Sequence, residues 1–170
     1  EYDDVKITLG NLPDTNFGVK IISQKEFDSK NIRFTKLDLK SYMTTGFADE
    51  VADDGQGGWS DQGPTNDLAD FTLRGEQYFE SVPFDIVEPA DNNGKSAIAL
   101  RGDGTGVYTK EAVIPVGQKA AGFYVIHVYS YDDNTVATYT YEYTDGTTAD
   151  ITITKNQQIF NWWGTKESNV

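Results

Sequence analysis

Apolar and polar residues alternate in several short stretches of the chain, and residues that favour turns separate these stretches. In residues 5–9 and 17–21 every second side chain is apolar, which is the period of a strand with one buried face. The other stretches that predict strands are 32–39, 83–87, 96–100, 112–116, 123–129, 136–143, 151–154 and 159–163. No long window repeats its apolar residues with the helical period of about 3.6 residues. The pattern therefore predicts an all-β protein, an antiparallel β-sandwich or barrel.

The apolar faces of the two strands determine the loop length of the hairpin that is expected near the C-terminus. Tyr139 and Tyr141 share one face of the first strand, and Ala149 and Ile151 share one face of the second. A three-residue loop (144–146) pairs Tyr141 with Ala149 and Tyr139 with Ile151, so that both apolar rows meet one core. A two-residue turn would put the rows on opposite sides. We therefore predict the three-residue loop, with its glycine in the left-handed conformation.

The stretch 123–129 is apolar on both faces, which predicts a central strand that is covered on each side. It contains His127, the single histidine of the chain, in line with Phe123, Val125 and Tyr129. A lone histidine in such a row is usually neutral and hydrogen-bonded in the core. We therefore expect His127 to have no catalytic or metal-binding role.

The length and the net charge of the chain limit the number of domains and the classes of ligand that it can bind. The chain of 170 residues suits one domain, and we assign residues 32–170 to a single module and residues 1–31 to N-terminal strands or a linker. The 27 acidic residues outnumber the 14 Lys and Arg, giving a net charge of −13. Such a surface repels phosphate, which argues against binding to nucleic acid or to an anionic membrane. We expect a monomer that takes a neutral ligand or a cation.

The sequence lacks cysteine and lacks any long apolar run. The chain has no cysteine, which excludes disulfides, thiolate metal sites and cysteine nucleophiles. No apolar run approaches the roughly 20 residues of a membrane span. Any metal site is therefore expected to use oxygen or nitrogen ligands.

Residues 49–70 form a long, glycine-rich, acidic stretch without Lys or Arg. A loop of this length inside a compact domain tends to be functional. Its crowded carboxylates can hold Ca²⁺, which prefers oxygen ligands, or they can extend into water and cap turns; both interpretations stay open. The residues expected to hold a structural Ca²⁺ are Asp49, Asp53, Asp54, Asp61 and Asp67.

The three tryptophans are candidate platforms for a sugar. Trp59 lies in the acidic stretch beside Asp61 and Gln62, where an indole face could stack on a pyranose ring while polar neighbours bind its hydroxyls. Trp59 fits equally well as an anchor that fixes the loop. Trp162 and Trp163 are adjacent, so on a strand they point to opposite faces and one of them faces outward. For this pair the anchoring interpretation is favoured.

Tyr131 and Asp132 follow the stretch 123–129 and are predicted to lie at a loop tip. Such tips carry ligand-binding residues in many sandwiches, which makes both residues candidates for glycan contacts. Asp132 is also a common turn residue, and the tight turn is the favoured interpretation.

No motif selects a catalytic group. Gly58, Ser60 and Gly63 are spaced one residue wider than the nucleophile elbow Gly-x-Ser-x-Gly, and no strand-to-helix turn is predicted there. A glycosidase needs two carboxylates about 5–10 Å apart across a cleft. The spacing of the 27 acidic residues singles out no such pair. We expect a protein without catalytic residues and keep a small glycosidase or lyase as an alternative.

Residues 46–63 (GFADEVADDGQGGWSDQG) resemble the central motif of a β-sandwich module that is appended to secreted bacterial glycoside hydrolases and related polysaccharide-degrading enzymes. The resemblance spans about residues 34–163. It includes the segments 37–39, 66–68, 82–86, 93–96, 114–117, 126–127, 143–146 and 162–163. Asn161 stands where that family usually has Asp before the paired tryptophans, so any role of that carboxylate does not carry over.

The resemblance implies a galactose-binding-like jelly roll with a carbohydrate-binding role. We therefore expect a secreted bacterial module that holds a polysaccharide or oligosaccharide near a catalytic domain in the same polypeptide. Aromatic stacking and hydrogen bonds from Asp, Gln and Asn would hold the glycan. The alternative is a structural spacer that stabilises its enzyme and binds no glycan.

Overall fold

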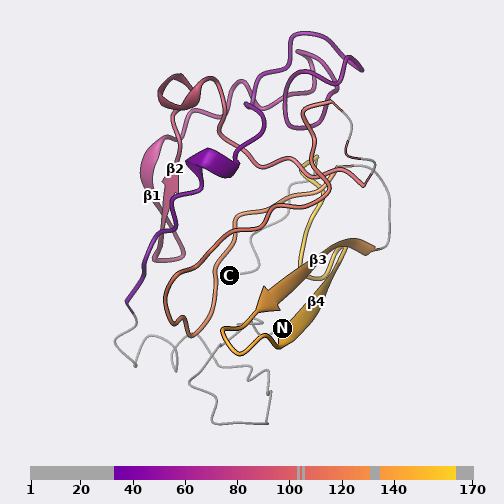
Figure 1. Ribbon diagram of the computed structural model, residues 1–170. Coiled ribbons are helices and arrows are strands. Elements are labelled where there is room, and N and C mark those ends of the chain that lie inside the picture. Colours follow the sequence, from indigo (N-terminus) through magenta and orange to yellow (C-terminus); the bar gives the residue numbers. More distant parts are fainter. Residues whose placement is uncertain (1–32, 103, 105, 131–134, 164–170) are drawn as a thin grey trace. The chain divides into compact units, whose positions relative to one another are not determined.

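The computed structural model describes residues 33–102, 104, 106–130 and 135–163 (Figure 1). These residues belong to two compact units. Unit 1 contains the described residues from 122 onward, and unit 2 contains those up to 121. The strands predicted at 5–9 and 17–21, and the N-terminal segment 1–31 as a whole, lie outside the described residues.

Unit 1 is built on the hairpin of β3 (Thr135–Glu142) and β4 (Thr148–Thr154), which are antiparallel. Tyr139 pairs with Ile151 and Tyr141 pairs with Ala149. The loop has three residues, because the N–H of Tyr143 donates to the carbonyl oxygen of Thr147 at 2.9 Å. Within it, Gly146 has a φ of 83°. The predicted loop length, register and left-handed glycine are all confirmed.

The hairpin buries one face in a small apolar core. Tyr129, Ile153 and Ile159 are its buried members, and Tyr139 and Ile151 pack against them. Along β4 the exposure alternates from residue to residue, with Thr148, Asp150 and Thr152 facing solvent. One face of the hairpin is therefore apolar and buried and the other is polar, as the alternation in the sequence predicts.

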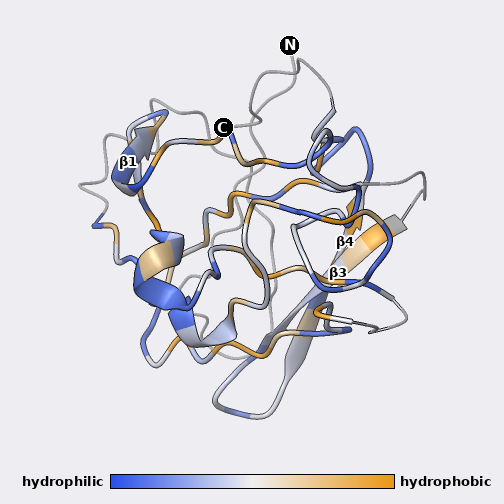
Figure 2. Cartoon of the chain, turned by 90° about the horizontal axis from the view of Figure 1, so that it is seen from above, coloured by the Kyte–Doolittle hydropathy of each residue, from blue (hydrophilic) through white to orange (hydrophobic). Residues whose placement is uncertain are grey.

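Unit 2 contains the second hairpin, formed by β1 (Gly75–Phe79) and β2 (Val82–Ile86). Its two-residue turn has both central residues in the left-handed region, with a φ of 47° at Glu80 and 68° at Ser81. This is the type I′ turn that suits the twist of a two-residue hairpin. β1 was not predicted, because it is largely polar (Figure 2) and its turn lacks the Asn-Gly or Asp-Gly signal.

Two short 3₁₀ helices, η1 (Lys40–Tyr42) and η2 (Pro89–Asn92), complete the regular elements of unit 2. The side-chain amide of Asn92 joins them, donating to the carbonyl oxygens of Lys40 and Lys95, each at 3.1 Å. One side chain thus ties the end of η2 to η1 and to the segment that follows.

Several predicted strands are wrong. Residues 33–39 and 112–116 form no strand, and 96–100 and 159–163 make only single bridges, for example Thr45 with Ala97. The alternation in these stretches describes an extended chain with two different faces. A strand also needs a neighbouring edge to receive its N–H and C=O groups, and alternation does not supply that edge.

The predicted central strand at 123–129 is also wrong. Only Tyr129 makes a bridge there, to Asn161. Val125, Ile126 and Val128 are 50%, 54% and 46% exposed, so the stretch is not covered on both sides. Apolar character on both faces was the only basis for that prediction, and it does not by itself bring covering layers to the segment.

The described residues are all-β, with two two-stranded antiparallel sheets and no α-helix among them. In this part of the chain no helix has the length and apolar character needed to cross a membrane.

Candidate functional site

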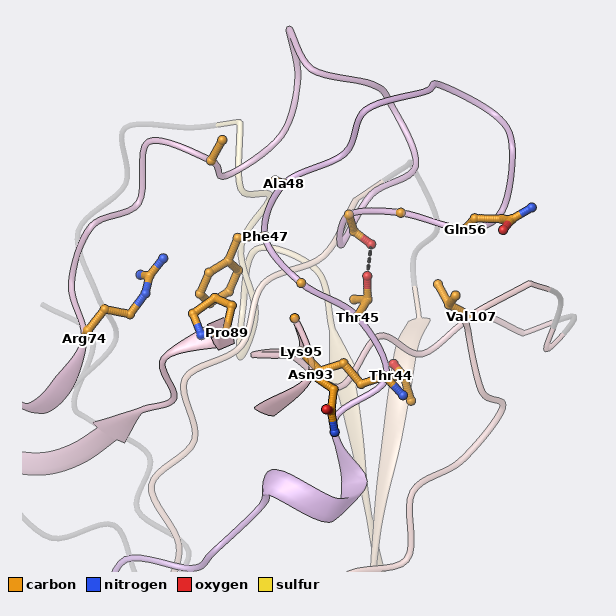
Figure 3. A pocket seen from close by; sticks show the side chains of 15 residues that line it. Thr44, Thr45, Phe47, Ala48, Gln56, Arg74, Pro89, Asn93, Lys95 and Val107 are labelled. Atoms are coloured by element: carbon orange, nitrogen blue, oxygen red, sulfur yellow. Dashed lines mark hydrogen bonds between the residues drawn. The ribbon is translucent and has the colours of Figure 1, made fainter. Parts of the chain in front are cut away.

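Unit 2 contains a cavity of about 510 Å³ (Figure 3). Three segments, 44–48, 56–58 and 93–95, form most of its wall. Single residues from elsewhere in unit 2 complete it: Ala69, Arg74, Pro89 and Val107. The lining mixes hydroxyl, amide and cationic side chains with the ring of Phe47 and the backbone of four glycines.

A bridge between Thr45 and Ala97 brings two of these segments together. The N–H of Ala97 donates to the carbonyl oxygen of Thr45 at 3.0 Å, and the N–H of Thr45 donates back at 3.2 Å. Beyond the bridge the backbones approach so closely that a Cβ on Gly46 would lie 2.5 Å from the carbonyl oxygen of Gly94. Only glycine fits at position 46 without a shift of the backbone.

The turn after η2 presents two polar side chains to the cavity. Asn93 and Gly94 are both left-handed, with φ of 54° and 79°. The N–H of Gly94 donates to the carbonyl oxygen of Pro89 at 2.7 Å, which closes the end of η2. Asparagine tolerates the left-handed region better than most residues, so Asn93 can combine this turn with a side chain on the cavity wall. Lys95 follows directly (Figure 3).

Arg74 and Phe47 form another part of the wall. The guanidinium carbon of Arg74 lies 5.1 Å from the centroid of the Phe47 ring and 5.8 Å from that of Phe71. Its Nη1 donates to the carbonyl oxygens of Phe71 at 2.6 Å and Leu73 at 2.7 Å. These contacts hold the guanidinium group in one place.

The acidic stretch folds around Asp49, which is only 2% exposed. Its Oδ2 accepts a hydrogen bond from the N–H of Gly63 at 2.7 Å, and its Oδ1 accepts one from Val51 at 3.3 Å. A Cβ at Gly57 would lie 2.7 Å from Oδ1, and one at Gly58 would lie 2.5 Å from the Cβ of Asp49. The buried carboxylate thus shapes the part of the loop that forms the cavity wall.

Two side chains from outside the loop, Thr45 and Tyr108, donate hydrogen bonds to the backbone of that wall. The hydroxyl of Thr45 donates to the carbonyl oxygen of Gly58 at 2.6 Å (Figure 3). The hydroxyl of Tyr108 donates to the carbonyl oxygen of Gly57 at 3.2 Å. The neighbouring N–H of Val107 donates to Gly55 at 3.0 Å. The loop is therefore held by hydrogen bonds at three residues, Gly55, Gly57 and Gly58.

Among the five residues expected to hold a metal, the structure brings together Asp49, Asp54 and Asp61. One carboxylate oxygen from each lies within 4.8 Å of the others, which fits a divalent cation. Asp53 and Asp67 are not in this group. Asp67 instead accepts the N–H of Asp49 at 2.8 Å, so it helps to position the buried carboxylate.

The residues of this loop that were expected to bind a sugar do not line the cavity. Trp59 is half-buried, and neither it nor Asp61 and Gln62 belongs to the lining. Asp61 is 7% exposed, and its carboxylate accepts the N–H of Gly55 at 3.0 Å. This contact places Asp61 in the internal structure of the loop.

The paired tryptophans belong to unit 1. Trp162 is half-buried and Trp163 is 62% exposed, and their rings meet edge to face with centroids 4.9 Å apart. Trp163 presents an aromatic surface to solvent. Tyr131 and Asp132, the remaining candidates, lie outside the described residues.

His127 is held from both ring nitrogens. Nε2 lies 2.8 Å from the carbonyl oxygen of Gln158, and Nδ1 lies 2.6 Å from the hydroxyl of Tyr139. Because a carbonyl only accepts, Nε2 carries a proton, and in the neutral ring Nδ1 accepts from Tyr139. Burial lowers the pKa of His127 and raises that of Tyr139 to about 12. The prediction of a hydrogen-bonded histidine is confirmed, although His127 is half-buried and not in a core row.

Comparisons of the chain with models of protein families, with curated proteins and with solved structures give no match.

Sequence reasoning missed the residues that line the cavity: Phe47, Gln56, Arg74, Asn93 and Lys95. Two signals were present, since Gly46-Phe47 and Asn93-Gly94-Lys95 both belong to the resemblance. Glycine next to a large or polar side chain in each segment was a sign of close backbone approach, but nothing in the sequence paired the two segments.

Proposed function

We propose that the chain is a non-catalytic carbohydrate-binding module and that the cavity of unit 2 is its glycan site. The lining chemistry supports this. The ring of Phe47 and the side chain of Pro89 offer apolar surface to a sugar face. Asn93 and Gln56 offer amide donors and acceptors for sugar hydroxyls.

The same lining supports binding over bond cleavage. None of the described residues that line the cavity is Asp or Glu. Glycoside hydrolysis in most families needs a carboxylic acid on one side of the scissile bond and a carboxylate on the other. The alternative of a small glycosidase therefore has no support at this cavity.

The proposal includes the setting that the resemblance implies: a secreted bacterial polysaccharide-degrading enzyme that carries this module in the same polypeptide. An open site of this kind is expected to bind with micromolar to millimolar affinity, about −8 to −4 kcal/mol. Attachment to an enzyme that engages the same polymer would raise the effective affinity, because the second contact becomes intramolecular.

We also propose that the two antiparallel hairpins belong to a β-sandwich of the jelly-roll kind. The one-sided burial of β3 and β4 supports this, because a sandwich strand buries every second side chain. A crystal structure would test it. Two packed sheets are expected, and an open arrangement without a second layer would contradict this part of the proposal.

The test of function deletes one polar side chain and leaves the backbone unchanged. Asn93→Gly removes the amide, while glycine adopts the left-handed conformation of that turn at least as readily. Asn156→Gly is the matched control, since Asn156 is exposed, also left-handed at 60°, and far along the chain in unit 1. Affinity gel electrophoresis in a panel of soluble polysaccharides, followed by calorimetry on the best binder, gives the affinities.

We expect Asn93→Gly to weaken binding about three- to tenfold, the effect of one or two lost hydrogen bonds, and Asn156→Gly to leave it unchanged. Equal affinities for both variants would move the site away from the cavity. Absence of retention in every polysaccharide would favour the spacer interpretation instead.

A further inference from the structure

The cavity differs in charge from the rest of the molecule. The chain carries 27 acidic and 14 basic residues, yet the described lining contains two cationic side chains, Arg74 and Lys95, and no carboxylate. Positive side chains gathered in a lining favour negative charge locally, even where the net charge of the protein is negative. The expectation of a neutral ligand followed from that net charge and ignored its distribution.

Arg74 is fixed in place and still has bonding capacity. Its Nη1 is used by two carbonyl oxygens, and its Nε faces Glu88 at 3.6 Å, an ion pair with a carboxylate that is 46% exposed. Within the described part of the chain, its Nη2 makes no hydrogen bond. A guanidinium group already held by carbonyls and aromatic faces loses little freedom when it binds an anion.

Lys95 is the second cation of the lining. It is exposed, and its ammonium group has no ion-pair partner among the described residues. The carbonyl of the same residue accepts from the side chain of Asn92 at 3.1 Å, which holds its backbone beside the left-handed turn. Asn93 also belongs to the lining, so an amide and an ammonium group both come from this turn (Figure 3).

We propose that the cavity selects an anionic sugar, a saccharide unit that bears a carboxylate or a sulfate group. This inference rests on the proposed function of the cavity. The positive charges of Arg74 and Lys95, from different parts of the wall, attract the acidic group, while Phe47 and Asn93 contact the ring and its hydroxyls. Charge-assisted hydrogen bonds of this kind are stronger than those to hydroxyls, so the acidic group would dominate affinity.

The experiment compares two pairs of polysaccharides, and within each pair the polymers share a backbone and differ in charge. Polygalacturonate, its fully methyl-esterified form, neutral galactan and sulfated galactan are titrated against the protein by calorimetry. The variants are Lys95→Gln and, as the matched control, Lys110→Gln, which removes the same charge from an exposed lysine outside the lining. Salt is varied from about 20 to about 300 mM to measure screening.

We expect binding to polygalacturonate or sulfated galactan, and the relative affinities of these two decide between carboxylate and sulfate. Lys95→Gln should weaken this binding about three- to tenfold and Lys110→Gln less than twofold, with affinity falling as salt rises. Binding to neutral and esterified glycans with equal or higher affinity would overturn the anionic preference while the proposed function stands. Absence of binding to all four polymers would overturn both.

Discussion

Removal of the Asp49 carboxylate tests whether the acidic loop is built around that group. Asp49→Ala leaves the buried N–H of Gly63 without its acceptor, and a hydrogen bond of 2.7 Å to a charged group is worth about 1.5–3 kcal/mol. The longer bond from Val51, at 3.3 Å, and the space left by the side chain add about 0.5–1 kcal/mol. The expected loss in the free energy of unfolding is therefore about 2–4 kcal/mol.

The assay is thermal and urea denaturation, with two comparison variants. For a chain of this size each kcal/mol corresponds to about 2–4 °C, so Asp49→Ala should lower Tm by about 4–16 °C. Asp49→Asn keeps the shape and one good acceptor, so it should lose about half as much. Asp70→Ala, an exposed aspartate of the same stretch, is the control and should change Tm by less than about 2 °C. A Tm for Asp49→Ala equal to that of the control would refute the reasoning.

The same measurements decide whether the loop also holds a cation. If Asp49, Asp54 and Asp61 share a Ca²⁺ ion, its addition should raise Tm and a chelator should reverse the rise, because a ligand bound only to the folded state stabilises it. Asp54→Asn should then abolish the response. Identical melting curves with Ca²⁺ and with chelator would assign the three carboxylates to backbone capping alone.

Three further predictions concern the turns, the cavity wall and pH. Glu80→Asn with Ser81→Gly gives a sequence preferred in type I′ turns, so urea denaturation should show a gain of about 1 kcal/mol; no gain would contradict the turn assignment. Gly46→Ala puts a Cβ 2.5 Å from a backbone carbonyl oxygen and should cost about 1–3 kcal/mol with weaker glycan binding, whereas Gly102→Ala, with open space around it, should do neither. The pKa of His127 is lower in the folded protein than in the unfolded chain. As pH drops below about 6.5, the unfolded chain therefore binds a proton at this residue before the folded protein does, and the free energy of unfolding should fall by at most about 1.4 kcal/mol per pH unit. His127→Gln should remove that slope, and an unchanged slope would assign it to other groups.

The sequence was sufficient where a local rule and a face pattern agreed. In the hairpin of β3 and β4, the apolar rows allowed one register, and Gly146 allowed one loop of the right length. That prediction depended on residues close together in sequence. His127 is hydrogen-bonded as expected, but the covered apolar row behind that expectation is wrong, and its partners Tyr139 and Gln158 lie outside the row.

The cavity depends on contacts that no local pattern contains. Thr45 and Ala97 are 52 positions apart, and their bridge is what places Gly46 against Gly94. The same limit explains the wrong strand at 123–129, because apolar side chains do not specify which edge they meet. The acidic residues were noticed for their charge, whereas Asp49 acts mainly as a buried acceptor for backbone N–H groups.

The most direct test of the glycan site is a titration of the ¹⁵N-labelled protein with an oligosaccharide of the best-bound polymer, followed by NMR. The indole N–H signals of the three tryptophans report on the alternative platforms, and the backbone N–H signals of Gly46, Asn93 and Gly94 report on the cavity. We predict saturable shifts at the cavity residues and unchanged indole signals for Trp162 and Trp163. Shifts confined to the indole signals, with the cavity residues unmoved, would contradict the assignment of the site.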